Sequence, residues 1–375
     1  MKKKVICIVD FGQSHMKFNL ITEKLIVART LIFKNNFKEK TDNNLFYNVN
    51  KIILKLKKIL KYIEINYNII SLSFVGHGSS CFIKDEKDKI LSGYHHESDF
   101  LQKKILKKYK SRIPKFNETF TPHLNHFHNM GKNYFILNAS YSKKKFLTLI
   151  SLFGWLFSNK NISDPSYISC HSHMWDFKKK DYSSLVDKKK FVYLPKIRSA
   201  GTYLGIKNKF KIYVGGHDTS VAFYFHSLFL NKNTIFLSTG TTFVMGKTKT
   251  HIKNIAQSSG FYYLCSPNKK GVYLSRKYDS KINFKKFRLT KIKTLIKRTN
   301  REIDIFRKFD DENIKNIIID GPFTKNKMFL NALNKANKDI KIYVAKNINS
   351  PSIGMAYICN KIKLKLNNFY LLYND

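Results

Sequence analysis

The sequence predicts an α/β protein of two similar units, each with a mixed sheet flanked by helices, and with a cleft between the units. Short apolar runs that end at Asp or Gly alternate with longer segments of helical periodicity, as strands and helices do in such sheets. The same order of elements, three strands followed by a helix and a strand, occurs twice. With 375 residues, 43% of them hydrophobic, the chain is long and apolar enough for more than one domain core.

The first unit begins with a continuous apolar strand that ends at Asp10. A turn containing Gly12 leads into two further strands. The helix that follows has its apolar residues at helical spacing, and the next strand is apolar and ends at Gly76. The elements predicted, in order, are strands at 5–9, 16–21 and 25–33, a helix at 49–63 and a strand at 69–75.

The second unit repeats this order. Between the units, residues 194–205 contain Gly, Ser and Pro with little periodicity, so we expect domains at 1–205 and 206–375. A further apolar run, Phe146 to Phe157, is too short to span a bilayer and is predicted to be a buried helix. The elements predicted for the second unit are strands at 235–238, 243–246, 261–264 and 272–275, a helix at 290–309, a strand at 317–319, a helix at 327–336, a strand at 342–345 and a helix at 353–366.

The formal net charge of +44 first suggests a nucleic-acid partner. However, only eight of the 69 basic residues are Arg, the residue best suited to paired contacts with phosphates and bases, and no run of Lys exceeds three. The accompanying excess of Asn, Ile, Phe and Tyr is typical of AT-rich coding sequence. We therefore keep nucleic-acid binding as an alternative, and expect the charge to attract anionic small molecules such as ATP.

The cysteines and the first residues favour a cytoplasmic protein without a membrane anchor. The five Cys residues are far apart and form no Cys-x-x-Cys pair, which argues against a disulfide framework or a structural zinc site. The start, Met-Lys-Lys-Lys, is like that of a signal peptide, but Asp10 interrupts the apolar stretch after five residues.

Three short motifs carry residues suited to phosphoryl transfer. Asp10 and Gly12, with Lys17, follow the first strand, where a carboxylate suits Mg²⁺ and a glycine lets backbone N–H groups approach phosphate. Asp218 follows two glycines and is placed to accept a hydroxyl proton. Residues 238–242, Ser-Thr-Gly-Thr-Thr, form a tight turn able to hold phosphate.

Each motif also has an ordinary structural interpretation. Asp and Gly are common in turns, so Asp10 and Gly12 fit a plain strand-to-turn connection. Asp218 precedes an apolar helix and fits a helix N-cap, and residues 238–242 fit a hairpin turn. The functional interpretation rests on their occurrence together, in this order and after these strands.

Taken together, the motifs resemble those of the FGGY family of carbohydrate kinases, within the superfamily of actin-like, hexokinase and heat-shock ATPases. The resemblance covers most of the chain and is nearest the rhamnulose and fuculose kinases. It rests on the first phosphate motif at 10–17, the sugar-contacting strand end at 75–78, the segment at 169–185, the catalytic-base motif at 215–219, the second phosphate motif at 238–242, the adenosine motif at 319–330 and the helix start at 354–356.

The resemblance implies two actin-like (ribonuclease H-like) domains and ATP-dependent phosphorylation of a sugar or polyol hydroxyl. It implies a sugar-binding domain at 1–205, a shortened ATP-binding domain at 206–375, and Asp218 as the general base, in contact with the sugar. It implies Mg²⁺ at Asp10, no membrane and a homodimer as one option for assembly. The residues it assigns to ATP are Asp10, Gly12, Lys17, Gly240, Thr241, Thr242, Gly321 and Asn326, and those it assigns to the sugar are Gly76, His77, Glu97 and Asp218.

Two departures from the family pattern leave an alternative open. The chain is short after the second phosphate turn, and where the adenosine motif normally has two or more adjacent glycines, Asp320 precedes Gly321 and Pro322 follows it. A degenerate member that binds sugar or nucleotide without turnover is therefore the second hypothesis. We expect Trp175 either to stack on a sugar face or to fill the core. Asp99, like Glu97, is a candidate for contact with sugar hydroxyls. The histidines at 95, 96, 123, 126 and 128 lack a convincing metal spacing.

Overall fold

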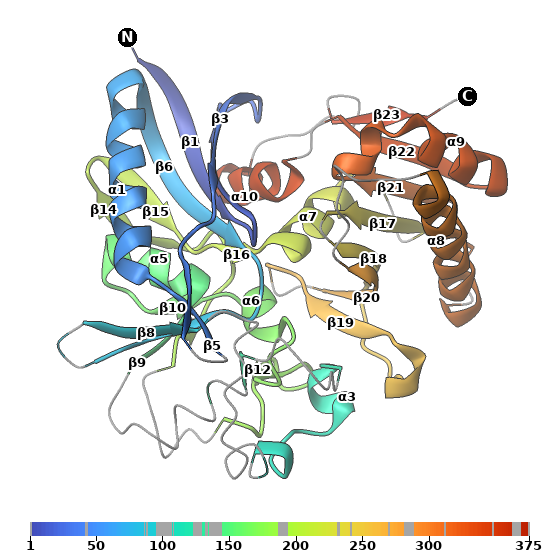
Figure 1. Cartoon of the computed structure of the whole chain (residues 1–375), viewed down its shortest axis with the longest axis horizontal. Helices are drawn as coiled ribbons and strands as arrows, with labels where there is room; N and C mark the ends of the chain where they lie inside the picture. Colours follow the sequence, from blue (N-terminus) through green and yellow to red (C-terminus); the bar gives the residue numbers. More distant parts are fainter. Residues whose placement is uncertain are drawn as a thin grey trace.

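The structure of the chain is a computed structural model, and it shows two units side by side (Figure 1). It describes residues 2–41, 44–85, 87, 89–94, 107, 109–122, 130–131, 134, 145–186, 194–230, 233–240, 242–268, 271–280, 289–310, 313–346, 349–361 and 369–373.

The first unit is built on a mixed sheet of seven strands. Strand β1 (Lys3–Phe11) pairs antiparallel with β2 (His15–Ile21), which pairs antiparallel with β3 (Val27–Lys34). On the other side β1 runs parallel to β6 (Tyr67–Gly76). Two later strands, β15 (Phe210–Tyr213) and β16 (Gly216–His217), also pair parallel with β6, and β14 (Tyr203–Lys207) closes the edge beside β15.

Helix α1 (Val49–Asn66) shows how the apolar pattern determines packing. The side chain of Asn48 caps it by accepting a hydrogen bond from the Lys51 N–H at 2.9 Å. Its buried residues recur at helical spacing and form one face toward the sheet, whereas the lysines lie on the other face. The buried set is Val49, Ile52, Leu56, Ile59, Leu60 and Ile63.

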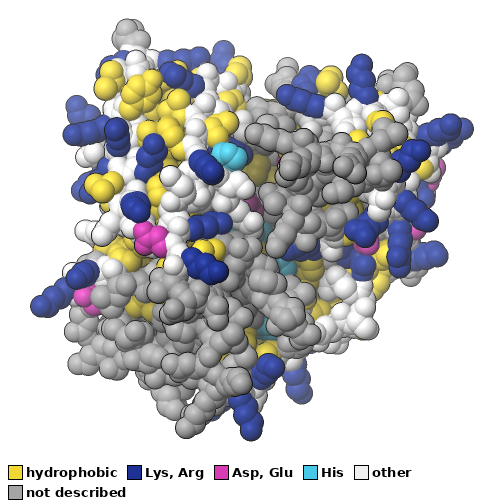
Figure 2. All heavy atoms as spheres, in the orientation of Figure 1, with side chains coloured by type: hydrophobic (Ala, Val, Ile, Leu, Met, Phe, Trp, Pro, Cys, Tyr) yellow, Lys and Arg dark blue, Asp and Glu magenta, His cyan; other side chains and the backbone are white. Residues whose placement is uncertain are grey.

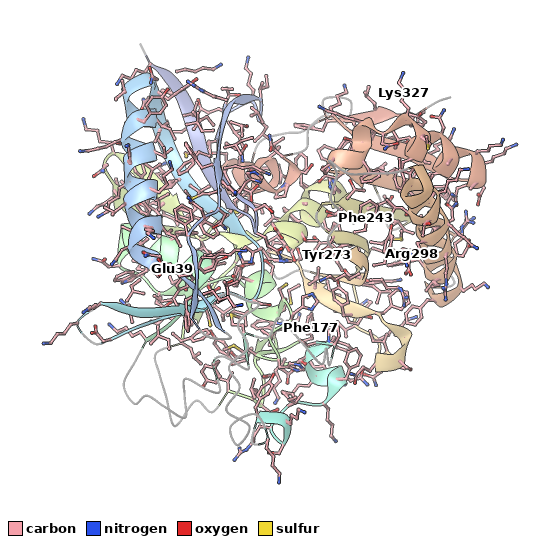
Figure 3. The ribbon with its side chains drawn as sticks, viewed as in Figure 1. Glu39, Phe177, Phe243, Tyr273, Arg298 and Lys327 are labelled. Carbon is pink, nitrogen blue, oxygen red and sulfur yellow. The ribbon has the colours of Figure 1, made fainter. Side chains whose placement is uncertain are left out.

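The second unit has the same plan. Its sheet has the order β19 (Tyr262–Cys265), β20 (Val272–Ser280), β18 (Thr242–Lys249), β17 (Thr234–Thr239), β21 (Asn316–Asp320), β22 (Lys341–Ala345) and β23 (Tyr370–Leu372). Helices α8 (Leu289–Asp310) and α9 (Lys327–Ala336) join its parallel strands. Phe243 and Tyr273 lie inside this unit, and Arg298 and Lys327 lie on its surface (Figure 3).

The two sheets share one strand order, and this confirms the predicted fold class. In each, a first strand pairs antiparallel with the second, which pairs antiparallel with the third (β1, β2, β3; β17, β18, β20). In each, the first strand also runs parallel to the strand that follows a long helix (β6; β21). The shortened second unit thus keeps the full repeat of strands found in the first.

Two helices lie where the units meet. Helix α7 (Asp218–Ser227) leads from the first sheet to the second, and α10 (Ser350–Asn360) packs on α7 and also on β1 and β6. The apolar cluster there joins Ile6 and Val75 of the first sheet to Val221 of α7 and Ile353 of α10. The expected boundary at 205–206 falls inside β14, and the first sheet continues to His217.

A smaller five-stranded sheet corrects one prediction. The run from Phe146 to Phe157 is not one helix, because its first residues belong to β9 (Lys145–Thr148), which pairs with β7 (Cys81–Lys84). Helix α5 (Leu149–Ser158) starts only after Thr148, whose side chain and that of Ser151 form a capping box. The other strands of this sheet are β4 (Lys38–Thr41), β5 (Asn44–Tyr47) and β8 (Ile90–Tyr94).

The last predicted helix is also corrected. It begins at Ser350, with Pro351 in its first turn, and ends at Asn360, because Lys361 adopts a left-handed conformation (φ 51°). None of the helices in the described residues is long and apolar enough to cross a membrane. The remaining short elements are α3 (Phe116–Thr119), β10 (Ile162–Ser163), α6 (Pro165–Ser169), β11 (Trp175–Asp176), β12 (Asp181–Tyr182), β13 (Lys196–Ile197) and the 3-10 helices Gln257–Ser259 and Pro322–Lys325.

Candidate active site

Three parallel strands of the first sheet end at the same level, and this brings two sequence motifs together. In the register of the sheet Phe11 lies beside Gly76, and Gly76 lies beside His217. Asp10 therefore precedes the end of one strand, and Asp218 follows the end of another, with β6 between them. Carboxyl ends of parallel strands form the usual ligand-binding edge of such sheets.

Asp10 faces a lysine across the β1–β2 ladder. Asp10 and Lys17 are direct partners in the antiparallel register, and the Lys17 Nζ lies 3.4 Å from Oδ2 of Asp10. Burial raises the pKa of the Asp10 carboxyl above its usual value, the Lys17 charge opposes this rise, and the Asp218 charge adds to it. The charge of Asp218 thus reaches the Asp10 carboxyl across the end of β6.

Asp218 is placed at the first turn of α7 with its carboxylate partly open. Residue 217 is the N-cap of α7, so Asp218 is not the cap in this structure. Its Oδ1 accepts hydrogen bonds from the N–H of Thr219 at 2.6 Å and from the Thr219 hydroxyl at 3.2 Å. Burial raises the pKa of Asp218 to about 6, although 29% of its side chain remains accessible. A carboxylate with these properties is suited to accept a proton near neutral pH.

His217 is a buried neighbour of this carboxylate that the sequence reading did not single out. Burial lowers its pKa to about 3, so the ring is neutral at physiological pH. Its Nε2 lies 3.3 Å from Oδ1 of Asp218 and 3.2 Å from Sγ of Cys170, and its Nδ1 lies 3.1 Å from the Ser220 hydroxyl. Nε2 thus faces both the Cys170 thiol and the Asp218 carboxylate, and the neutral ring packs beside the carboxylate oxygen that Thr219 also contacts.

The approach of the chain to Asp218 requires glycine. A Cβ at Gly215 would lie 2.2 Å from the carbonyl oxygen of Phe74, so β6 and the strand leading to Asp218 pass too closely for any side chain. The two glycines before Asp218 are therefore part of the packing that carries the carboxylate to the strand ends.

The segment before α6 supports the same motif and was also missed. Asp164, fully buried, accepts hydrogen bonds from the N–H groups of Ser166 and Tyr167 as the N-cap of α6, with Pro165 in the first turn. Burial raises its pKa to about 7. The hydroxyl oxygen of Ser166 in turn accepts a hydrogen bond from the His217 N–H at 3.1 Å. Asp-Pro-Ser is a helix-start signal in the sequence, but its contact with residue 217 depends on tertiary structure.

In the second unit, the Gly-Thr-Thr motif is the connection between β17 and β18. Thr239 pairs with Phe243 across this hairpin, and Gly240 has open space where a Cβ would stand. Thr242 is the first residue of β18, and Thr241 lies outside the described residues. The turn thus ends the strand that corresponds to β1, at the position matching Asp10–Gly12 in the first unit.

The adenosine motif lies beside this turn, and its unusual Asp320 points inward. Gly321 has φ 96°, and a Cβ there would lie 2.8 Å from Oγ1 of Thr239, so glycine is needed at 321. The Asp320 side chain is buried, accepts from the Gly321 N–H at 2.7 Å, and lies 3.5 Å from Nε2 of His226. Nδ1 of His226 is 2.6 Å from the Tyr370 hydroxyl.

The other predicted site residues have mixed outcomes. His77, buried at the end of β6, has its Nε2 2.9 Å from the Tyr47 hydroxyl. Asn326 caps α9 by accepting from the Phe329 N–H at 3.0 Å. The Gly12 carbonyl accepts a hydrogen bond from the Asn35 amide at 2.7 Å. Residues outside the described part of the chain are Glu97, Asp99 and the histidines at 95, 96, 123, 126 and 128.

Two further features bear on the alternatives. Trp175 is buried, as expected of a core residue, and no cluster of metal-binding side chains occurs among the described residues. Lys and Arg side chains are scattered over both halves of the face shown in Figure 2, and are not gathered in one stripe.

Comparison with solved structures shows the fold of this chain. It matches a carbohydrate kinase from Novosphingobium aromaticivorans with a TM-score of 0.80 and 15% identity, over 99% of this chain and 94% of that chain. The chain has the two-domain fold of the carbohydrate kinases. A ligand-bound xylulose kinase from Lactobacillus acidophilus matches with a TM-score of 0.78 and 14% identity, over 99% of this chain and 93% of that chain.

A glycerol kinase with ADP from Plasmodium falciparum also matches, with a TM-score of 0.77 and 14% identity, over 98% of this chain and 92% of that chain. No family model and no curated protein matches the sequence. The fold therefore agrees with the resemblance seen in the motifs, whereas the roles of individual residues rest on the geometry described above.

Proposed function

We propose that this protein transfers the γ-phosphoryl group of ATP to a hydroxyl of a sugar or polyol, with Asp218 as the general base. The observation that carries the proposal is the meeting of Asp218, Asp10 and Lys17 at the strand ends of the first sheet. Phosphoryl transfer needs positioned reactants, stabilised phosphate charge and a group that takes the hydroxyl proton. This set of side chains matches those needs.

Asp218 has the properties of the proton acceptor. With a pKa of about 6, its carboxylate is mostly ionised at neutral pH yet more basic than an ordinary aspartate. The Thr219 N–H and hydroxyl hold one of its oxygens, and the neutral His217 ring lies 3.3 Å from the same oxygen. The acceptor hydroxyl would then bind at the remaining open side of the carboxylate, where its proton is transferred as the oxygen attacks phosphorus.

Asp10 fits the binding of Mg²⁺. Magnesium prefers oxygen ligands, and is usually bound through one or two carboxylates together with substrate phosphates. Asp10 offers such a carboxylate, largely buried, with one oxygen facing Lys17. The ion would neutralise phosphate charge there, and Lys17 would add a second positive charge near the same oxygens.

The second unit would hold the nucleotide. Gly240 follows the first strand of this unit and Thr242 begins the second, and Gly321 lies against the first strand through Thr239. Asp320 does not extend toward this turn, since its carboxylate is bound inside by the Gly321 N–H and lies beside His226. The Asp320 carboxylate is therefore engaged inside the unit, which supports an active kinase over a degenerate one.

The acceptor class is inferred from the first unit and from the similar proteins. The solved structures include xylulose, glycerol and gluconate kinases, so we infer a ketose, sugar acid or polyol as acceptor. Gly76 and His77 at the end of β6 stand beside the strand that leads to Asp218. Because the sites for acceptor and nucleotide lie on different units, closure of the units would complete the site and exclude water.

With five free cysteines, we also infer a cytoplasmic location.

The proposal is tested by ADP release with a panel of ketoses, polyols and sugar acids, for the wild type and Asp218→Asn. We expect at least one acceptor to be phosphorylated by the wild type only, with ATP binding by calorimetry unchanged in the variant. Turnover that survives in Asp218→Asn would exclude the base assignment. A folded protein that binds ATP but phosphorylates no acceptor would favour the degenerate alternative.

A further inference from the structure

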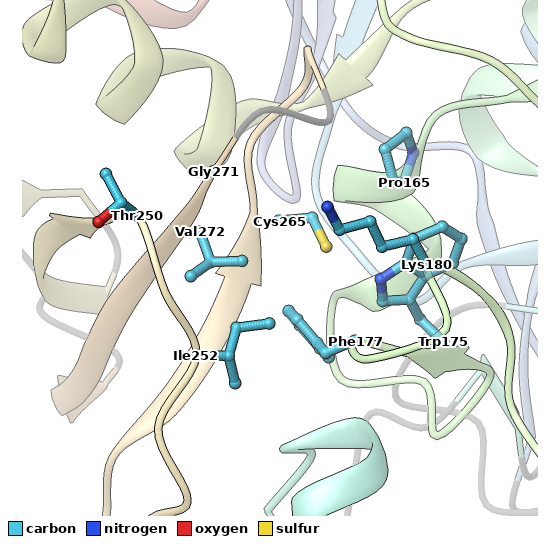
Figure 4. A pocket seen from close by; sticks show the side chains of 9 residues that line it. All are labelled: Pro165, Trp175, Phe177, Lys180, Thr250, Ile252, Cys265, Gly271 and Val272. Carbon is cyan, nitrogen blue, oxygen red and sulfur yellow. The ribbon is translucent and has the colours of Figure 1, made fainter.

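A cavity between the two units lies apart from the residues proposed for catalysis. It has an empty volume of about 470 Å³, part of it open to solvent. Trp175, Phe177 and Lys180 line it from the first unit, and Ile252, Cys265 and Val272 line it from the second (Figure 4). Asp10, Lys17 and Asp218 are not among the described residues that line it, whereas Trp175, one of the two options for which was stacking on a sugar, is.

The chemistry of the lining selects for an apolar molecule with a negative charge. Its walls are aromatic and aliphatic, and Lys180 is the only charged side chain among the lining residues that the structure describes. Burial raises the pKa of the Cys265 thiol to about 12, so the thiol stays neutral. No carboxylate of the described residues forms an ion pair with Lys180, although its charge acts on Cys265. An anionic ligand in the cavity would pair with this exposed ammonium.

The turn that carries Lys180 is rigidly built. Oδ1 of Asp176 accepts hydrogen bonds from the N–H groups of Lys178 and Lys179, both at 2.9 Å, and the Asp176 carbonyl accepts from the Lys180 N–H. Lys180 has φ 54°, in the left-handed region where glycine or asparagine is usual. The Lys180 side chain is exposed although it lines the cavity, so its charge lies where the cavity opens to solvent, with the amine over Cys265 in Figure 4.

Helix α6 connects the cavity to the catalytic motif. Pro165, its first residue, lines the cavity. The next residue, Ser166, accepts a hydrogen bond from the His217 N–H at 3.1 Å, and Ser169 accepts one from the Cys265 N–H at 3.3 Å. The same short helix thus contacts the residue before Asp218 and a strand of the second unit. A molecule in the cavity would touch both units and this helix.

We propose that this cavity is a regulatory site for a small monoanion with a flat apolar body, of the arylalkanoate class. The apolar walls bind the ring, and Lys180 binds the carboxylate. Because the ligand bridges both units, it changes how readily they close, and so changes turnover. The binding itself is independent of the proposed kinase function, and only the effect on turnover rests on it.

Tryptophan fluorescence tests the binding directly. The chain has two tryptophans, Trp155 and Trp175, so Trp155→Phe leaves Trp175 in the cavity wall as the only reporter. Phenylalanine keeps an aromatic ring for the Lys84 amine, which lies 3.8 Å from the Trp155 ring centre. We expect phenylacetate to change Trp175 emission saturably, and 2-phenylethylamine, of matched size and opposite charge, to bind at least about tenfold more weakly.

Variants of the turn make the test specific. Lys180→Asn removes the charge while asparagine still suits the left-handed conformation, and should weaken phenylacetate binding about tenfold or more. Lys178→Met, which removes an exposed lysine two residues away, should leave binding unchanged. Ile252→Trp should fill the cavity and abolish binding, which is measured by calorimetry for this variant because the new tryptophan would add to the emission. Circular dichroism confirms that each variant is folded.

Several results would overturn the proposal. These are a response to phenylacetate that does not saturate, equal binding of the anion and the amine, or unchanged binding in Lys180→Asn. If phenylacetate competes with the sugar that serves as phosphoryl acceptor, the cavity is part of the acceptor site and not a separate regulatory site. If phenylacetate binds as expected but no sugar is phosphorylated, the kinase proposal fails and the ligand site stands. If the kinase is active, phenylacetate should alter kcat or KM in the wild type and not in Ile252→Trp.

Discussion

The two units place different chemistry at the same point of the same sheet. In the first unit, Asp10 stands one residue before the end of β1 with Lys17 opposite it, and these are charged side chains. In the second unit, Gly240 follows the end of β17, with hydroxyls and backbone at the turn. A repeated fold thus supplies one edge suited to an ion and proton transfer, and one suited to cradling phosphate and nucleotide.

Helix α7 shows the same contrast within one element. Asp218 at its start has a partly accessible carboxylate, whereas His226 near its end lies 3.5 Å from the buried Asp320 of the second sheet. Both contacts pair a histidine with an aspartate. Only the first carboxylate remains open to a substrate, so we assign it catalysis and assign Asp320 a packing role.

The largest expected effect separates these two aspartates. Asp218→Asn should lower kcat by about 10²–10⁴-fold, because proton transfer by a positioned base contributes that much. Asp320→Asn, the matched control at the other end of α7, should keep most of the activity. ADP release under saturating ATP measures both, and a similar loss in the two variants would contradict the distinction.

The pH profile should report the environment of Asp218. Since its pKa is raised to about 6, kcat/KM should rise about tenfold per pH unit below 6 and level off above it. The unfolding free energy depends on pH with the opposite sign. The folded state binds the proton more tightly than the unfolded state, so this group stabilises the fold below its ordinary pKa of 3.8, and that contribution is lost as pH rises to about 6.

Both trends are measured on one pair of proteins. Rate profiles from pH 4.5 to 8, and urea unfolding over the same range, should be compared for wild type and Asp218→Asn. In Asp218→Asn, the unfolding free energy should not show the fall that the wild type shows as the pH rises to about 6. A rate profile that is flat through pH 6 in the wild type would show that another group limits proton transfer.

Two glycines at the nucleotide edge form a matched pair for stability. Gly321→Ala should cost about 1–3 kcal/mol, because residue 321 has φ 96° and the new Cβ would press on Thr239. Gly240→Ala meets open space and should change unfolding free energy by less than about 0.5 kcal/mol. Denaturant unfolding distinguishes them, and equal losses would mean that the close approach of the two strands is not the reason for glycine at 321.

The smallest expected effect concerns Asp320. Asp320→Gly restores the glycine pair of the family pattern, but leaves the Gly321 N–H and His226 without this partner, at a cost of about 1–2 kcal/mol. ATP affinity should be unchanged, since the carboxylate faces away from the turn. Calorimetry with ATP checks this, and a large gain in affinity on removing Asp320 would support a nucleotide site that is impaired in the natural chain.

Much of the fold was predictable because its strands and helices follow from apolar runs and periodicities in short segments of the sequence. Continuous apolar runs located β1 and β6, and helical spacing located α1, since burial of one face needs that spacing. The prediction of one helix from Phe146 to Phe157 was wrong because an apolar stretch fits a strand or a helix equally well. Pairing with β7 and the cap at Thr148 decide the change from one to the other.

The candidate site was predictable only in part. Asp10 and Asp218 were found from the glycines and strands around them. His217 was passed over although it stands next to Asp218, because its importance comes from Cys170, Ser166 and Ser220 around its ring and backbone. No short-range pattern signals contacts between residues about fifty positions apart.

By itself, the sequence determined the elements, their twofold repetition and the chemical types at the strand ends, because these follow from local periodicity and from turn residues. Tertiary structure decided which of those residues meet. It set Asp10 and Asp218 on either side of β6, raised the pKa of Asp218 by burial, and turned Asp320 away from the nucleotide turn. Distances between distant segments and the loss of water around a charge exist only once the chain has packed.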